Sequence, residues 1–286
     1  MIYNLIAVVA QGRLGNQLFQ YAFAYASAKK LSCNFYIDKR YEKYVLSEYF
    51  QLSNDFFSKL DRYVFSIGGF RKFFSSFLRL GIYALIERKT IRNEAFFSDT
   101  EAPSKQLIKI NNHTKYHGFF QSEDYFLQYR AEITKEFKIK KRHQISFNQI
   151  FNTIPKDKKI VVVQIRRTDY IELNICLSAT YYHSAIKETY NENNFYIVIS
   201  DDKKFINEEF GYLTNKYISN HDEIIDFQFL MNADICIISN STFGWWGAYL
   251  NKKKPKIYAP KYWLGFVEKE EFPNGIIPNE FTEIEA

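Results

Sequence analysis

Two arginines and a carboxylate follow an apolar run in the middle of the chain. Residues 160–163 read Ile-Val-Val-Val and are followed by Gln164, Arg166, Arg167 and Asp169. This run predicts a strand buried on both faces in a parallel sheet, and ligands bind at the carboxyl ends of such strands. Because side chains alternate along a strand, we expect one arginine to meet an anion and the other to be held by Asp169 or a backbone carbonyl. An ordinary ion pair at a solvated strand end is the alternative.

Two later apolar runs end in polar groups that would reach the same sheet edge. Residues 194–199 precede Asp201 and Asp202, and residues 233–238 precede Ser239, Asn240, Ser241 and Thr242, which enter a further predicted helix. The amides and dipole at a helix N-terminus favour an anion. Cations, carboxylates and hydroxyls along one edge predict a composite site that suits a nucleoside diphosphate.

The paired carboxylates have two functional interpretations. They can bind a divalent metal, or one can accept hydrogen bonds from a guanine edge or a ribose while the other caps the next helix. Neither a third carboxylate nor a histidine lies nearby in the sequence, so the metal-free interpretation is favoured.

The N-terminal segment predicts a strand, a glycine-containing turn and a helix. The strand covers residues 2–9, the turn contains Gly12 and Gly15, and residues 18–26 are rich in alanine and aromatic side chains, as in a helix packed closely on a sheet. Glycines let a ligand approach the backbone, and Arg13, Asn16 and Gln17 offer donors there. The spacing is not that of a dinucleotide fingerprint, so a purely structural turn is an equal alternative. Further along, His117 and Gln121 are candidates to line a cleft, although a lone histidine is more often a packing residue.

Charge and composition divide the chain into two domains, 1–150 and 151–286. The first holds 23 basic against 13 acidic residues and the second 15 against 19. Since the arginine motif lies in the acidic half, an anionic substrate or a membrane surface is a better partner than nucleic acid. A helical insertion is expected near residues 56–92, and basic and aromatic residues within 70–92 fit either contact with an anionic membrane or internal packing.

Cysteine usage and the N-terminus favour a cytoplasmic protein. Cys33, Cys176 and Cys236 show neither zinc-site nor disulfide spacing, which fits a reducing compartment. The first residues lack a basic leader and a cleavage site, so the cytoplasm is expected, with peripheral contact at the inner face of the plasma membrane left open.

Four segments together resemble glycosyltransferase family 11, the α-1,2-fucosyltransferases. They are residues 12–22 (GRLGNQLFQYA), 165–170 (IRRTDY), 199–202 (ISDD) and 239–248 (SNSTFGWWGA). The resemblance implies an α/β fold of GT-B type, with two Rossmann-like domains facing a central cleft. It implies transfer of L-fucose, with inversion, from GDP-β-L-fucose to the 2-hydroxyl of a terminal galactose, without a metal or another cofactor. In bacteria such enzymes decorate surface polysaccharides such as O-antigen, so the acceptor is a surface glycan, with a lipid-linked one left open.

The same resemblance assigns roles to residues. Arg166 is expected on the GDP pyrophosphate, with Asp201 and Asp202 on guanine or ribose and Ser241 and Thr242 on the phosphates. The catalytic candidates are Arg166, Asp169 and Glu172; the donor-binding set is Gln164, Arg166, Arg167, Asp201, Asp202, Ser239, Ser241, Thr242, Gly15 and Asn16; the acceptor-binding set is Arg13, Gln17, His117 and Gln121.

One departure from the family pattern leaves alternatives open. The family usually has histidine where this chain has Gln164, and glutamine cannot become cationic near neutral pH. A glycosyltransferase of the same fold with another nucleotide sugar or linkage is therefore a second hypothesis, and a catalytically silent nucleotide- or glycan-binding protein is a third. The general base is also open, because an arginine bound to Asp169 would make that carboxylate a poor base.

Overall fold

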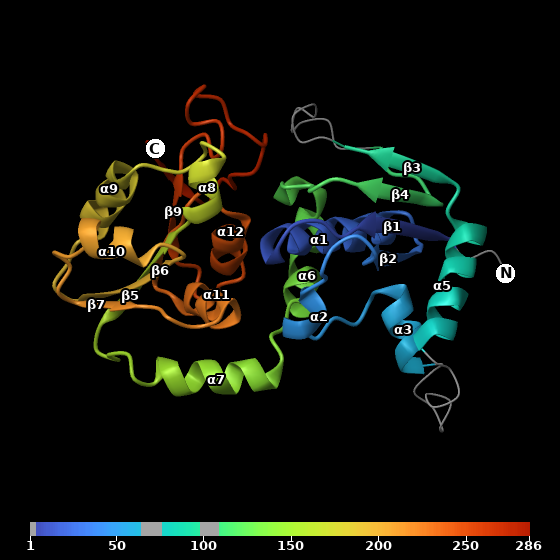
Figure 1. Cartoon of the computed structure of the whole chain (residues 1–286), viewed down its shortest axis with the longest axis horizontal. Helices are drawn as coiled ribbons and strands as arrows, with labels where there is room; N and C mark the ends of the chain where they lie inside the picture. The colour runs from blue at the N-terminus through green and yellow to red at the C-terminus, as the bar shows by residue number, and fades with distance from the viewer. Residues whose placement is uncertain (1–3, 64–75, 98–108) are drawn as a thin grey trace. The chain divides into compact units, whose positions relative to one another are not determined.

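The computed structural model describes residues 4–63, 76–97 and 109–286 and divides the chain into two compact units. Unit 1 is Met1–Ile139 and unit 2 is Lys140–Ala286, each an α/β unit around its own parallel sheet (Figure 1). The sequence-based boundary, after residue 150, falls at the end of α7 (Lys141–Phe151) and not at its start. The ring of Phe147 in α7 packs on Phe229 of unit 2, with centroids 5.3 Å apart, so this helix belongs to the second unit.

Unit 1 has a four-stranded sheet in the order β2-β1-β4-β3, with every pair parallel. Its strands are β1 (Leu5–Val9), β2 (Asn34–Asp38), β3 (Asn93–Phe96) and β4 (Thr114–His117). Helix α1 (Leu14–Lys30) connects β1 to β2 and is buried along most of its length, because its small alanines let it lie close to the sheet. The predicted strand–turn–helix is therefore present.

The other helices in the described residues of unit 1 are shorter than α1. They are α2 (Leu46–Tyr49), α3 (Phe56–Tyr63), α5 (Ser76–Thr90), the 3-10 turns Glu123–Tyr125 and Leu127–Tyr129, and α6 (Arg130–Glu136). Ser122 caps the first of these turns by accepting from Asp124 N at 3.2 Å. Within the expected 56–92 insertion, residues 64–75 lie outside the described residues.

The described part of this insertion packs on unit 1. Tyr83 of α5 stacks on Phe57 of α3 with centroids 4.2 Å apart. Glu87 of α5 binds Lys115 of β4, and Lys115 Nζ lies 3.1 Å from Asp38 Oδ2. Burial would raise the pKa of Asp38, but its bonds to Arg40 and Lys115 hold that pKa below its usual value. This charged cluster ties α5 to the sheet, as the internal-packing alternative expects.

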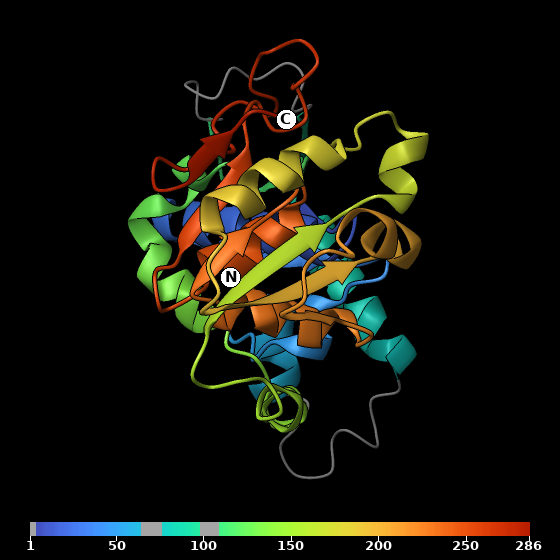
Figure 2. The same cartoon turned by 90° about the vertical axis from the view of Figure 1, so that its left-hand side faces the viewer.

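Unit 2 has a six-stranded sheet in the order β10-β9-β8-β5-β6-β7, with every pair parallel. Figure 2 shows β5 and β6 running side by side in the same direction. The strands are β5 (Lys159–Ile165), β6 (Asn194–Ser200), β7 (Lys216–Ile218), β8 (Ile235–Ile237), β9 (Lys256–Pro260) and β10 (Thr282–Ile284). The run around residue 160 is thus an inner strand of a parallel sheet, as predicted.

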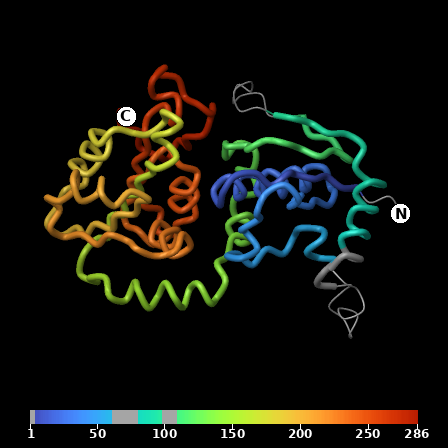
Figure 3. The backbone as a smooth tube through the Cα atoms, in the orientation of Figure 1, coloured from blue at the N-terminus to red at the C-terminus, as the bar shows by residue number. Residues whose placement is uncertain are grey.

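Helices follow most of these strands along the backbone of unit 2 (Figure 3). They are α8 (Thr168–Glu172), α9 (Ala179–Thr189), α10 (Lys203–Glu209), α11 (Glu223–Asn232) and α12 (Thr242–Tyr249). Val161, Val163 and Ile165 of β5 share one core with side chains of α9 and α10. Because side chains alternate, Gln164 points to the other face, where it meets α12.

Candidate functional site

Arg166 lies at the carboxyl end of β5, between two carboxylates. Its NH2 group donates to Asp169 Oδ2 at 2.8 Å, and its NH1 group lies 3.0 Å from Asp201 Oδ2. Burial alone would lower the pKa of Arg166, but these carboxylates raise it above its ordinary value. A guanidinium has five N–H donors, so this arrangement orients a permanent cation and leaves donors for an anionic ligand.

Arg167 has different partners from Arg166, although the two side chains are equally exposed, at 19%. Its Nε donates to Asp202 Oδ2 at 3.2 Å, and its guanidinium lies over the Phe205 ring, 3.7 Å from the centroid. The sequence predicted that Asp169 or a backbone carbonyl would hold one of the two arginines, and Asp169 does bind Arg166. Arg167 is held by Asp202, a partner that the sequence did not indicate. The cause is long-range, since β6 lies beside β5 and brings Asp202 to the arginine motif.

Asp201 and Asp202 connect the second motif to the first. Asp201 accepts from Thr168 Oγ1 at 2.6 Å and from Arg167 N at 3.0 Å. Asp202 caps α10 by accepting from Phe205 N at 3.0 Å, which is the capping role considered for one of this pair. That bond holds the pKa of Asp202 below its usual value despite a smaller opposing effect of burial, and Arg167 lowers it further. Both carboxylates therefore build the arginine site.

The third polar segment, residues 239–242, connects the carboxyl end of β8 to the start of α12. Ser239 is fully buried, and its N and Oγ donate to Gln164 Oε1 at 3.2 and 2.9 Å. Asn240 donates to Ile175 O at 2.8 Å, and its buried Oδ1 has no hydrogen-bond partner within the described ranges. Ser241 occupies the N-cap position without a side-chain cap bond, so the first-turn amides of α12 remain suited to an anion.

Buried tryptophans fix α12 in this position. Trp245 and Trp246 are fully buried, and Trp245 Nε1 donates to Ile276 O at 2.7 Å. Tyr170 O–H donates to Asn240 O at 3.3 Å, which links α8 to the loop before α12. The predicted donor residues of unit 2 thus lie at or just beyond the carboxyl ends of β5, β6 and β8. Glu172, the last residue of α8, is exposed.

In unit 1, the side chain of Gln17 is buried and hydrogen-bonded to nearby backbone groups. It is 1% exposed, its Nε2 donates to Gly12 O at 2.9 Å and Lys43 O at 2.8 Å, and its Oε1 accepts from Val45 N at 2.9 Å. Gly12 has φ +70°, which favours glycine. The turn is therefore held by its own side chains, and the acceptor role of Gln17 stays a prediction.

Other candidates in unit 1 lie near one another around α1 and β4. Gln121 Nε2 donates to Asn16 Oδ1 at 3.0 Å, so two predicted residues meet. His117 Nε2 lies 3.2 Å from Glu94 Oε2, and its ring stacks on Phe96 with centroids 4.2 Å apart. Gly15 is buried within α1, whereas Arg13, just before that helix, is exposed. No ligand role is tested by these contacts.

Asp226 was missed by the sequence analysis. It lies in the first turn of α11, accepts from Ser219 Oγ just after β7, and has its pKa raised to about 7 by burial. Strongly shifted carboxyls concentrate at functional sites. The local signal was weak, because an acid in a helix's first turn is ordinary; its position between Ile225 and Phe227, on a mostly buried helix, was the available clue.

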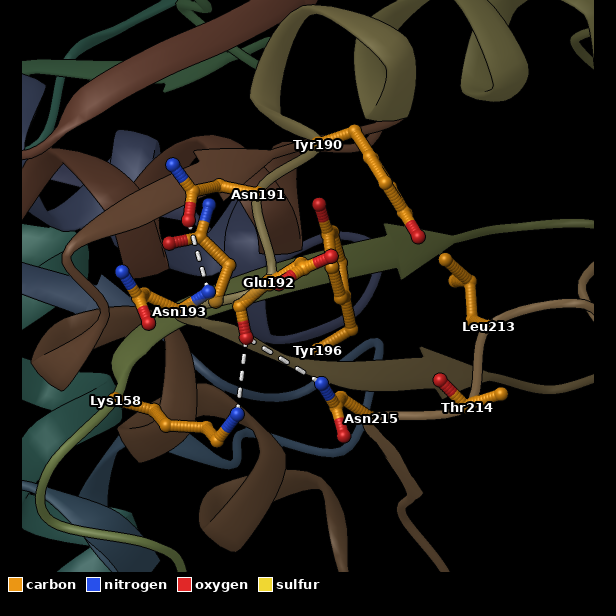
Figure 4. Close-up of a pocket in the computed structure, with 10 residues that line it drawn as sticks. Lys158, Tyr190, Asn191, Glu192, Asn193, Tyr196, Leu213, Thr214 and Asn215 are labelled. Carbon is orange, nitrogen blue, oxygen red and sulfur yellow. Dashed lines mark hydrogen bonds between the residues drawn. The ribbon is translucent and has the colours of Figure 1, made fainter.

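A polar pocket lies at the opposite edge of the unit 2 sheet from the arginine residues. Its volume is about 470 Å³, and Figure 4 shows the residues that line it, which include the turn before β6 and the loop before β7. Lys158 Nζ donates to Glu192 O at 2.9 Å, and Asn193 N donates to Asn191 Oδ1 at 2.8 Å. It lies at the amino ends of the strands and shares no residue with the arginine network.

Among the residues that the structure describes, no group of three or more His, Cys, Asp and Glu side chains is placed to hold a metal ion. Cys33, Cys176 and Cys236 are free thiols. None of the described helices combines the length and apolarity needed to cross a bilayer.

Comparison with known proteins gives a consistent family and fold. The chain matches the family model of Glycosyl transferase family 11 over residues 5–270. It is 29% identical over 290 residues to an alpha-1,2-colitosyltransferase of Escherichia coli, covering 94% of each chain. It is 27% identical over 288 residues to the O-antigen biosynthesis glycosyltransferase WbnK of Escherichia coli, covering 88% of this chain and 93% of that one.

A solved structure with a similar fold is that of NodZ, an alpha-1,6-fucosyltransferase from Bradyrhizobium that was co-crystallized with GDP. The TM-score is 0.56 at 14% identity, covering 89% of this chain and 94% of NodZ. The predicted α/β fold of GT-B type, with two Rossmann-like domains, is confirmed. The cleft between the domains stays a prediction.

Proposed function

The chain belongs to Glycosyl transferase family 11, and from this premise we propose that it transfers L-fucose from GDP-β-L-fucose to the 2-hydroxyl of a terminal galactose on a surface glycan. The observation that carries the proposal is Arg166, a cation oriented by Asp169 and Asp201 beside the uncapped start of α12. Inverting transfer builds negative charge on the departing diphosphate. Oriented guanidinium and amide donors stabilise such charge, a contribution of about 3 kcal/mol per strong donor.

The order of the strands suggests how the donor lies. Neighbouring strands are about 4.8 Å apart, and their order in this part of the sheet is β8-β5-β6-β7. Along one edge, this order gives the segment after β8 that carries Ser239, Ser241 and Thr242 (the hydroxyl loop), then Arg166 after β5. The aspartate pair after β6 comes next, followed by Asp226 in the helix after β7. The diphosphate would lie over β8 and β5, and the ribose and base over β6 and β7. Because Asp201 and Asp202 are engaged by the arginine motif, we assign the guanine edge to Asp226, whose carboxylate can accept from two N–H groups.

The contact of Asp169 with Arg166 assigns it a positioning role. A carboxylate that binds a guanidinium at 2.8 Å is a weak proton acceptor, so leaving-group stabilisation is the main source of catalysis in this proposal. Glu172 is then the candidate base at this edge. We expect Glu172→Gln to lower kcat less than Arg166→Ala does.

Colitose is the second donor candidate, because the alpha-1,2-colitosyltransferase is similar over 94% of both chains. Colitose lacks the 3-hydroxyl of fucose, so the two donors test the same site with one polar group changed. The decisive assay offers GDP-fucose and GDP-colitose with terminal galactosides and identifies the new linkage by NMR. Preference for GDP-fucose with an α-1,2 product supports the first proposal, whereas preference for GDP-colitose supports the second.

The proposed reaction is metal-independent and takes place in the cytoplasm, with a lipid-linked glycan as one acceptor. Activity that is unchanged by EDTA would support this chemistry, and strict dependence on manganese or magnesium would overturn it.

Absence of both transfer and donor hydrolysis, with GDP still bound, would favour a catalytically silent binding protein.

A further inference from the structure

Gln164 links β5, the strand that precedes Arg166, to the hydroxyl loop after β8. It is 3% exposed on β5, and its Oε1 accepts from both the N–H and the hydroxyl of Ser239, a residue distant in sequence that follows β8. One carbonyl oxygen has two lone pairs and can accept both bonds, whereas a neutral histidine offers a single acceptor nitrogen. Glutamine is therefore chemically suited to hold this loop.

Gly244 makes the close approach of α12 to Gln164 feasible. A Cβ added at this glycine would lie 2.5 Å from Gln164 Oε1 and 3.1 Å from Ile238 Cβ. The first distance is shorter than any ordinary contact, so a side chain here would push Gln164 or the helix away. The buried amide of Gln164 therefore packs directly against Gly244, where there is no room for a side chain.

We infer that Gln164 and Gly244 form a positioning pair that sets the start of α12 against Arg166. The inference rests on the proposed function, since the groups it aligns are those assigned to the diphosphate. Ser239 is three residues before Thr242, the first residue of α12, so its two bonds fix the path of the backbone whose amides face the anion. Gln164 acts through Ser239 and is not itself assigned a contact with the reacting atoms.

A double-mutant cycle tests the pair. Gln164→Ala, Gly244→Ala and the double variant are compared with the wild type by calorimetric titration with GDP and by thermal unfolding. We expect each single variant to bind GDP about tenfold more weakly, the size that loss of two buried hydrogen bonds allows. In the double variant the new methyl group fits the space left by the amide, so the effects on stability should not add.

The decisive comparison is between the thermal stability of the double variant and its affinity for GDP. If the pair positions the site, the double variant regains thermal stability relative to Gly244→Ala but still binds GDP about tenfold more weakly than the wild type. If Gln164 only supports the fold, GDP affinity recovers together with stability, and the inference is overturned. Additive losses of stability would also overturn it, since they would mean that the two residues do not share one contact.

Asn251→Ala is the matched control. Asn251 is 6% exposed in unit 2, and its Nδ2 donates to Leu230 O at 2.8 Å and Ala233 O at 2.9 Å, before the amino end of β8 and away from the residues assigned to GDP. We expect it to lower thermal stability and leave GDP affinity unchanged. Wild-type protein that does not bind GDP would refute the proposed function, whereas GDP binding that Gln164→Ala leaves intact would refute only the inference.

Discussion

At the scale of single residues, the two adjacent arginines have different roles although they are chemically identical. Arg166 is oriented by Asp169 and Asp201 at the edge of the sheet, and Arg167 is held by Asp202 over the Phe205 ring. Arg166 binds one carboxylate from α8 and one from the segment after β6, whereas Arg167 binds a different carboxylate after β6, so different partners orient the two guanidinium groups. Only Arg166 is therefore assigned to the anion.

The first prediction concerns Arg166→Ala. We expect kcat/KM for transfer to fall by about 100-fold or more, the loss typical of removing one oriented charged donor. Two carboxylates are also left without their cation, so some loss of thermal stability is expected. The exposed Arg142→Ala variant, in α7, serves as a control for the loss of a positive charge. More than about a tenth of wild-type activity in Arg166→Ala would contradict the assigned role.

The second prediction concerns Asp226 and pH. The unfolded carboxyl titrates near 3.8 and the folded one at about 7, so the folded state keeps a proton that the unfolded state loses between these values. The contribution of this carboxyl to the stability of the folded state therefore falls as pH rises from about 4 to 7. Asparagine cannot ionise and still offers Oδ1 to Ser219.

Asp226→Asn should accordingly melt at a higher temperature than the wild type at pH 8, with the difference shrinking toward pH 4. Thermal unfolding across this range measures the effect. The same variant should lose GDP affinity at pH 8 if this carboxylate meets guanine. A melting difference that does not vary with pH would show that the carboxyl is not protonated in the folded protein.

At the scale of elements, strands were the most predictable part of the molecule. Residues 160–163 and 194–199 are apolar because both faces of inner parallel strands are buried, and both runs lie within strands. Asp202 as a helix cap was also foreseeable, because capping depends on local sequence.

Contacts between distant segments could not be predicted in the same way. The bond from Ser239 to Gln164 joins a residue in the loop after β8 to a residue of β5, and neither segment's sequence indicates the other as its partner. Asp226 escaped notice for a related reason: its raised pKa comes from burial, which the first turn of a helix does not reveal. Local pattern gave the elements and the resemblance gave candidate roles, whereas partners depended on which strands are neighbours.

The third prediction concerns α5 and a membrane surface. Its inner side packs on unit 1, yet Leu80 and Leu85 are 62% and 54% exposed, and Arg88 and Lys89 lie in its last turn. We expect the protein to sediment with vesicles containing phosphatidylglycerol and less with neutral vesicles. Leu80→Glu with Leu85→Glu should weaken sedimentation, while Leu127→Glu, at another exposed leucine of unit 1, should not. Equal sedimentation of all variants would exclude these exposed leucines of α5 as the contact.

At the scale of the whole molecule, the two units differ in how much of the donor they are assigned. Unit 2 carries the arginine network, the aspartate pair and the start of α12, whereas unit 1 contributes only Gly15 and Asn16 to the predicted donor set. Asn16 is already bonded to Gln121, and Gly15 is buried in α1. Nucleotide binding is therefore expected to depend mainly on unit 2.

Hydrogen exchange with GDP and with the intact nucleotide sugar tests this division. GDP should slow exchange in residues 164–172, 200–206 and 239–246, because ligand that binds only the folded site lowers the population of open states there. Residues 12–17 should respond only when the sugar is present, since the sugar is the part of the donor that must reach the acceptor. Arg166→Ala should abolish protection in unit 2 at the same nucleotide concentration. Protection by GDP alone in residues 12–17, as strong as in unit 2, would contradict this division and assign the nucleotide to both units.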